Sequence, residues 1–120
     1  MKILVVDDSK AMRMIVIRTF RQLGQAEHEF VEAEDGADGL AKLRSEQPDL
    51  VISDWNMPEM TGIELLEAAR AEGSTTTFGF ITTETSTEFR ERAIAAGAAF
   101  MLAKPFDAVA LSEALGAVAA

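Results

Sequence analysis

Cysteine is absent from the sequence, which excludes a disulfide framework and a metal site built from thiolates. A long apolar segment is also absent, since no run approaches the roughly 20 residues that a membrane-spanning helix needs. The start of the chain, residues 1–6, passes directly into Asp7 and Asp8 without a signal-peptide cleavage site. We therefore expect a cytoplasmic protein that is neither exported nor inserted into a membrane.

Positive charge is scarce, because 20 acidic residues stand against 11 basic ones and the formal net charge is −9. Direct binding to nucleic acid normally needs a positive field, so we expect none. The acidic excess favours a basic partner or solubility alone, and charge does not distinguish the two. The 120 residues, 48% of them apolar, suffice for one continuous core. We expect a single domain over residues 1–120.

Short apolar segments alternate with helical patterns along the whole chain. The expected strands cover residues 2–6, 28–33, 49–53, 78–82 and 100–103. Apolar residues at helical spacing follow each of them, and those expected to face a sheet include Met12, Ile15, Val16, Thr19, Phe20, Leu23, Leu40, Leu43, Ile63, Leu66, Ala69, Phe89, Ala93, Ile94, Leu111, Leu115 and Val118. This alternation predicts an α/β fold, namely a doubly wound five-stranded parallel sheet with helices on both faces.

The last two predicted helices carry recognisable end signals. Thr85 with Glu88 three residues later forms a capping box, and Gly97 is expected to end that helix. Asp107 is the expected N-cap of the final helix, and the alanine-rich residues 114–120 continue that helix.

Polar residues follow the predicted strands at the points where they end. Asp7 and Asp8 follow the first strand, Asp54 follows the third, Thr82 ends the fourth and Lys104 follows the fifth. Each residue alone has an ordinary explanation as a helix cap, a turn residue or a surface charge. Because parallel strands place their C-terminal ends at one edge of a sheet, the joint placement favours a functional site.

The carboxylates at this edge predict a metal site. Three of them in proximity repel one another unless a cation lies among them, and hard oxygen ligands suit Mg²⁺. Lys104 adds a compact positive charge and Thr82 a hydroxyl, which suit the oxygens of an incoming phosphoryl group. A carboxylate can then act as the nucleophile.

The same residues resemble the response-regulator receiver family, especially its stand-alone chemotaxis members. The resemblance rests on residues 5–13 (VVDDSKAMR), 53–58 (SDWNMP) and 104–106 (KPF), and it covers essentially the whole chain. The combination of these motifs is specific to the family, whereas any single motif would be weak evidence. It implies the flavodoxin-like strand order 2-1-3-4-5.

The resemblance also implies a metal and a phosphoacceptor. Asp54 would accept the phosphoryl group, and Asp8 and Asp54 would ligate Mg²⁺ directly. Asp7 would ligate it through water, and the backbone carbonyl of Asn56 would complete the protein ligands. No enzymatic activity is expected beyond phosphorylation and dephosphorylation of the chain itself.

Further roles follow from the resemblance. Thr82 and Lys104 would contact the phosphoryl oxygens, and Pro105 would follow a cis peptide bond, which X-Pro sequences tolerate. Asn56 and Glu84 flank the acceptor and the switch threonine as in family members that dephosphorylate quickly. We therefore expect a short-lived phosphorylated state.

Two positions depart from the family pattern. Thr83 stands where the family commonly has alanine, serine or glycine, so its branched side chain could narrow access to Asp54. Met101 stands where the family usually has an aromatic residue that turns inward on activation, and Phe100 should face the opposite way in a strand. Met101 either fills the same pocket or only packs in the core. Trp55, the single tryptophan, offers a fluorescence reporter beside the acceptor.

The implied partners are a histidine kinase as phosphodonor and an output protein, with the flagellar motor switch first among the candidates. The output protein would bind the surface of the fourth helix, fifth strand and fifth helix, and the chain is expected to be a monomer.

A phosphorelay intermediate, a phosphate sink and a pseudo-receiver that is never phosphorylated are alternative functions. A haloacid-dehalogenase-like phosphatase would need an aspartate in place of Asn56, and a flavodoxin-like mononucleotide binder would need a glycine-rich phosphate loop in place of Asp7 and Asp8.

Overall fold

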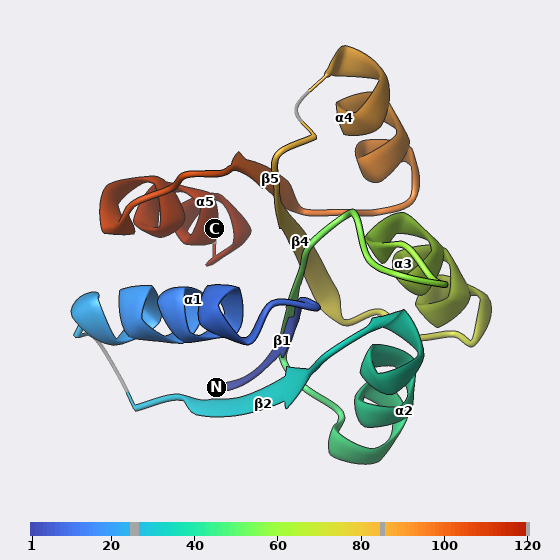
Figure 1. Ribbon diagram of the computed structural model, residues 1–120, viewed down its shortest axis with the longest axis horizontal. Helices are drawn as coiled ribbons and strands as arrows, with labels where there is room; N and C mark the ends of the chain where they lie inside the picture. Colours follow the sequence, from blue (N-terminus) through green and yellow to red (C-terminus); the bar gives the residue numbers. More distant parts are fainter. Residues whose placement is uncertain (25–26, 85, 120) are drawn as a thin grey trace.

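Five strands alternate with five helices in the computed structural model, which describes residues 1–24, 27–84 and 86–119 (Figure 1). Each strand begins within one residue of its expected position. The elements in chain order are β1 (Lys2–Val6), α1 (Lys10–Gln22), β2 (Glu29–Ala33), α2 (Gly36–Glu46), β3 (Leu50–Ser53), α3 (Gly62–Ala71), β4 (Thr77–Thr82), α4 (Thr87–Ala95), β5 (Phe100–Ala103) and α5 (Ala108–Ala119).

The strands form one sheet in the order β2-β1-β3-β4-β5, and all neighbouring strands are parallel. This confirms both the expected fold class and the expected order. Val6, the last residue of β1, lies in register with Ala33 of β2 and Ser53 of β3. Thr82 at the end of β4 is likewise paired with Ala103 of β5. The residues that follow these strands therefore lie along one edge of the sheet.

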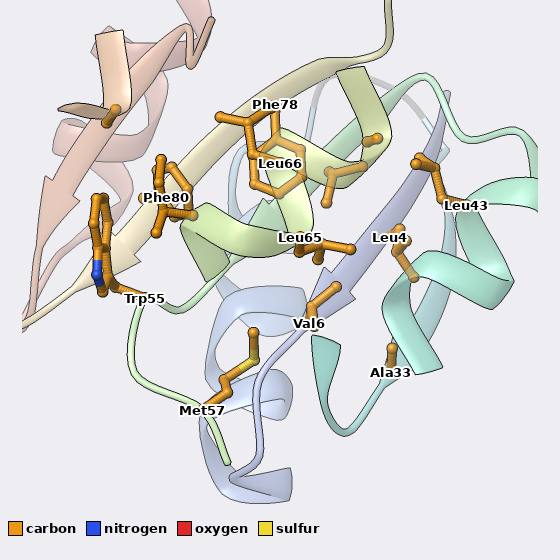
Figure 2. Close-up of a cluster of buried hydrophobic side chains, with 14 residues drawn as sticks. Leu4, Val6, Ala33, Leu43, Trp55, Met57, Leu65, Leu66, Phe78 and Phe80 are labelled. Carbon is orange, nitrogen blue, oxygen red and sulfur yellow. The ribbon is translucent and has the colours of Figure 1, made fainter. Parts of the chain in front are cut away.

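The helices cover both faces of the sheet, with α1 and α5 on one side and α2, α3 and α4 on the other (Figure 1). Alternate residues of each central strand belong to different cores, as the two-residue period of a strand requires. Leu4 and Val6 of β1 pack into the core under α2, α3 and α4, which Figure 2 shows. Ile3 and Val5 pack into the core under α1 and α5. Because both faces are covered, these strands are apolar throughout.

The buried face of α1 is rotated relative to the expected one. Val16 and Phe20 are buried as predicted, but Ile15 is 43% exposed and that part of the prediction is wrong. Ile17 is buried instead, in the same cluster as Leu111 of α5. Since α5 packs beside α1, it extends the buried face toward Ile17, and Ile15 is left at the opposite edge.

Helix α4 differs from the prediction at its start and on its surface. The N-cap is Ser86, whose hydroxyl accepts the Phe89 N–H at 3.4 Å, so the predicted capping box of Thr85 and Glu88 is wrong. Thr85 itself lies outside the described residues. Ile94 was expected to be buried, but it is 65% exposed. The helix rests on the sheet through the narrow stripe of Phe89, Ala93 and Ala96, and Ile94 lies beyond it.

Helix α5 begins as expected, because the Asp107 carboxylate accepts the Ala110 N–H at 2.8 Å. Leu111 is fully buried and Leu115 packs partly against the same core, whereas the side chain of Val118 lies outside the described part of the chain. Within that described part, no helix is both long enough and apolar enough to cross a membrane.

Candidate phosphoacceptor and metal site

Backbone hydrogen bonds bring the strand ends together. The N–H of Asp54 donates to the carbonyl of Val6 at 2.9 Å, and the N–H of Asp7 donates to the carbonyl of Ala33 at 3.1 Å. The N–H of Lys104 donates to the carbonyl of Thr82 at 2.9 Å. Each of these bonds continues the ladder of the sheet by one residue, so the sheet itself positions the first polar residue after β1, β3 and β5.

Three carboxylates converge at this edge, as predicted. Oxygens of Asp7, Asp8 and Asp54 all lie within 4.8 Å of one another. Their environments differ, because Asp7 is 4% exposed while Asp54 is half-buried and Asp8 is exposed. The cluster, which we call the acidic pocket, is therefore exposed to solvent on the side of Asp8.

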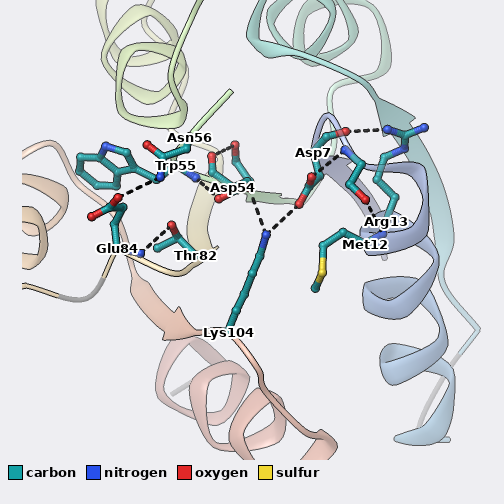
Figure 3. A network of polar contacts seen from close by, with 11 residues as sticks. Asp7, Met12, Arg13, Asp54, Trp55, Asn56, Thr82, Glu84 and Lys104 are labelled. Carbon is teal, nitrogen blue, oxygen red and sulfur yellow. Dashed lines mark hydrogen bonds and ion pairs between the residues drawn. The ribbon is translucent and has the colours of Figure 1, made fainter. Parts of the chain in front are cut away.

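Lys104 reaches into this pocket from the end of β5 (Figure 3). Its ammonium group lies 3.1 Å from Oδ2 of Asp54 and 3.3 Å from Oδ2 of Asp7. Burial alone would lower the pKa of Lys104, but the hydrogen bond and the charge of Asp54, together with those of Asp7, outweigh burial and raise it. Lys104 is thus held in its charged form. The peptide bond that follows it, Lys104–Pro105, is cis, as the resemblance implies.

The carboxylate of Asp54 is held on both of its oxygens. Oδ1 accepts the N–H of Trp55 at 2.6 Å, and Oδ2 accepts from Lys104. The orientation of the carboxylate is therefore determined by the backbone of its own loop and by the residue that follows β5. Such a fixed orientation favours attack on a group that enters from the open side of the pocket.

Burial raises the pKa of Asp7, and the nearby charge of Asp54 acts in the same direction. The N–H of Ser9 and the ammonium of Lys104 lower it without reversing the shift. One lysine therefore does not neutralise the pocket. Closely spaced oxygen donors with an excess of negative charge form a donor set that fits a hard divalent cation such as Mg²⁺.

The substitution Asp7→Asn is expected to stabilise the metal-free protein by an amount on the order of 1 kcal/mol. Asparagine keeps the oxygen that accepts the Ser9 N–H at 2.9 Å. It loses the contact with Lys104 at 3.3 Å, but it also removes the desolvated charge, and burial is the largest influence on this carboxyl. Because the pKa of Asp7 is raised in the folded state, the folded protein keeps a proton at pH values where the unfolded chain has lost it. Stability thus falls as the pH rises through that range.

Urea unfolding of Asp7→Asn and of the unaltered protein, with a metal chelator present, measures this effect across the range in which carboxylates titrate. We expect the difference to grow with pH and to shrink when Mg²⁺ is added. If Asp7→Asn were less stable than the unaltered protein at neutral pH, the buried charge of Asp7 would not be what destabilises the metal-free protein.

The remaining predicted residues surround Asp54. The amide of Asn56 donates to Oε1 of Glu84 at 3.0 Å, so these two side chains meet beside the acceptor (Figure 3). The hydroxyl of Thr82 is fully buried and accepts the N–H of Glu84 at 3.1 Å. Thr83 is exposed. The structure thus brings Asn56, Glu84 and Thr82 together.

Met101 and Phe100 face opposite sides of the sheet, as predicted. Met101 packs against the core that holds Trp55 and Phe80, and Phe100 packs against the other core. The ring of Phe100 covers Gly79 of β4, where a Cβ atom would lie 2.2 Å from the ring. Phe100 is therefore a packing residue in this structure.

Sequence reasoning missed two contacts near the site. Phe89, which was assigned only to a helix face, packs edge-on against Trp55 with ring centroids 4.9 Å apart. It thereby joins α4 to the residue next to Asp54. Arg13, quoted only as part of a motif, lies beside Asp7 and donates to its backbone carbonyl. The sequence marked Arg13 only as part of the motif over residues 5–13, and nothing in that motif indicated a contact with Asp7.

Known proteins resemble this chain over nearly its whole length. The family model for the response regulator receiver domain matches residues 3–116. The chemotaxis protein CheY of Pseudomonas aeruginosa is 40% identical over 115 residues, which cover 94% of this chain and 91% of that protein. CheY-3 of Vibrio cholerae is 41% identical over 117 residues, covering 96% and 88%.

Solved structures agree with these matches. The chemotaxis protein CheY4 of Vibrio cholerae has a TM-score of 0.84 at 39% sequence identity, with 96% of this chain and 95% of that chain covered. The receiver domain of the Francisella response regulator 1452 has a TM-score of 0.85 at 27% identity, with 97% and 94% covered.

Proposed function

Because this chain belongs to the response regulator receiver domain family, we propose that it is a signalling switch that is phosphorylated on Asp54. The observation that carries this proposal is the pairing of Asp54 with Lys104 at 3.1 Å within a group of three carboxylates. The phosphodonor is a phosphohistidine of a partner kinase.

The transfer is a substitution at phosphorus. A carboxylate oxygen of Asp54 forms a bond to phosphorus while the bond between phosphorus and the imidazole nitrogen of the kinase breaks, and the electron pair stays on that nitrogen. Lys104 stays charged because of its carboxylate neighbours, and it offers its ammonium group to a phosphoryl oxygen. The protein therefore contributes alignment and positive charge.

The pocket also accommodates Mg²⁺. Asp8 and Asp54 would bind it directly, Asp7 through water, and the backbone carbonyl of Asn56 would complete the protein ligands. When bound, Mg²⁺ would neutralise the carboxylates and the incoming phosphoryl oxygens.

The signal passes to a partner protein. A phosphoryl group adds close to two negative charges, and a movement of Thr82 toward it would alter the neighbouring surface of α4, β5 and α5. The contact of Phe89 with Trp55 links helix α4 to the acceptor loop, which joins β3 to α3 and carries Asp54. We place the output protein on this surface, and the similarity to chemotaxis proteins favours a component of the flagellar motor switch. We further propose that the chain works as a cytoplasmic monomer.

Intact-mass measurement after incubation with a small-molecule phosphodonor tests the proposal. We expect one added phosphoryl group in the presence of Mg²⁺ and little or none with a chelator, because the uncompensated carboxylates repel the donor. The adduct should decay soon after the donor is removed, since Asn56 and Glu84 flank the acceptor as in family members that dephosphorylate quickly. The absence of an adduct, with the cognate kinase also supplied, would favour a pseudo-receiver.

A further inference from the structure

Arg13 of α1 makes two contacts beside the acidic pocket that the proposed function leaves unused. Its side chain is only 12% exposed. One guanidinium nitrogen donates to the backbone carbonyl of Asp7 at 2.6 Å, and Nε donates to Oε1 of Glu32 at 2.9 Å. Figure 3 shows that Arg13 approaches the backbone of Asp7, whose carboxylate points toward Lys104.

The bonded carbonyl belongs to the peptide unit that joins Asp7 to Asp8. A peptide unit is planar, so a hydrogen bond that orients its carbonyl also orients the bonds leading to both α-carbons. On its other side, Asp7 is held by the bond from its N–H to Ala33 of β2. The contact with Arg13 therefore restrains the direction in which the exposed Asp8 leaves the strand end.

Such a restraint is useful because the three carboxylates repel one another and, among the residues that the structure describes, Lys104 is the cation paired with them. Asp8 follows the end of β1, so the turn into α1 is the part of the pocket that repulsion can open. Arg13 suits the restraint, since its planar group donates to two acceptors at once. Glu32 compensates its charge, so the guanidinium is not left buried without a counterion.

We propose that Arg13 is a positioning residue that sets the spacing of Asp7 and Asp8 for a divalent cation. The proposal rests on the proposed function, because it assumes that the pocket binds Mg²⁺. Arg13 acts through the backbone of Asp7, and its pairing with Glu32 serves only to hold the guanidinium in place.

Titration with MgCl2 at constant ionic strength, followed by the fluorescence of Trp55, tests this role. Trp55 is suitable because it directly follows Asp54 in the chain and its backbone N–H bonds to the carboxylate of that residue. We expect Arg13→Gln to weaken Mg²⁺ binding about tenfold, a size typical of residues that orient metal ligands. Arg13→Lys should weaken it by about threefold, because lysine can reach one acceptor but lacks the planar fork.

Two other variants separate positioning from general stability. Glu32→Gln removes the charge of the ion pair but keeps a side-chain oxygen that can accept the Nε–H of Arg13, so the guanidinium stays in place and we expect the Mg²⁺ affinity to change less than about twofold. Arg44→Gln removes a second arginine–glutamate pair, in which Nε of Arg44 lies 2.8 Å from Glu72, and it should leave the affinity unchanged. The rise in melting temperature on adding Mg²⁺ should follow the same order among the variants.

The possible outcomes decide the proposal. Equal Mg²⁺ affinity in Arg13→Gln and the unaltered protein would overturn it, and so would a Glu32→Gln variant that is impaired as strongly as Arg13→Gln. If Arg13→Gln does not fold, weaker binding by Arg13→Lys than by Glu32→Gln supports the proposal and equal binding overturns it. An unaltered protein that shows no response to Mg²⁺ would instead overturn the proposed function, and this inference with it.

Discussion

Asp54→Asn is expected to lower phosphoryl incorporation at least about 100-fold, equivalent to about 2.7 kcal/mol of transition-state stabilisation. The asparagine amide lacks the negatively charged oxygen that attacks phosphorus. Its oxygen can still accept the N–H of Trp55, which Asp54 now accepts at 2.6 Å, so the loop should keep its conformation. The measurement is the intact mass after incubation with a phosphodonor and Mg²⁺, together with circular dichroism to verify folding.

A matched control lies at the other end of the same strand. Asp49 precedes β3, and its carboxylate accepts the N–H of Lys2 at 2.7 Å, whereas Asp54 follows β3. Asp49→Asn makes the same chemical change away from the pocket, and we expect it to keep the full adduct. An adduct of normal size in Asp54→Asn, or its loss in Asp49→Asn, would mean that the acceptor has been assigned to the wrong carboxylate.

Gly62→Ala is expected to destabilise the protein by about 3 kcal/mol. A Cβ atom at this first residue of α3 would lie 2.0 Å from the carbonyl oxygen of Asp54 and 2.9 Å from the ring of Phe80. The carbonyl has little room to withdraw, because the hydroxyl of Ser53 bonds to it at 2.8 Å. The backbone of the acceptor must shift, so phosphoryl incorporation should fall as well. Urea unfolding and intact mass measure the two effects.

Gly116→Ala is the appropriate control for this substitution. Gly116 is an exposed residue of α5, and a Cβ atom there meets nothing within 4 Å. Alanine should therefore stabilise the protein by roughly 0.5–1 kcal/mol through its higher helix propensity. If Gly62→Ala were as stable as the unaltered protein, the close approach of α3 to the acceptor loop would not be a constraint in solution.

The fold class and the convergence of the candidate site residues were predictable because both depend on local patterns, whereas the strand order came from the family resemblance. Apolar segments such as residues 49–53 are each followed by a stretch with apolar residues at helical spacing. This alternation indicates parallel strands that share one C-terminal edge. Asp54 and Lys104 are 50 positions apart in sequence, yet each directly follows such a segment. Placing them at one edge therefore required the element order alone, without any knowledge of distances.

Helix faces were harder to predict, because burial depends on the neighbours of a helix. Ile15 and Ile94 fit the period of their helices, yet both are exposed, since α5 covers a different side of α1 and only a narrow stripe of α4 meets the sheet. The start of α4 was misplaced for a related reason. Thr85, Ser86 and Thr87 can all cap a helix, and nothing local distinguishes them.

By itself, the sequence determined the order of elements, the two-sided burial of the strands and the set of polar residues at their ends, because these follow from periodicity and residue chemistry. Only the tertiary structure decided which groups touch. The bond from Arg13 to Asp7 and the packing of Phe89 on Trp55 depend on helices α1 and α4 meeting the sheet at particular positions. Those positions result from packing among many residues, which no local pattern encodes.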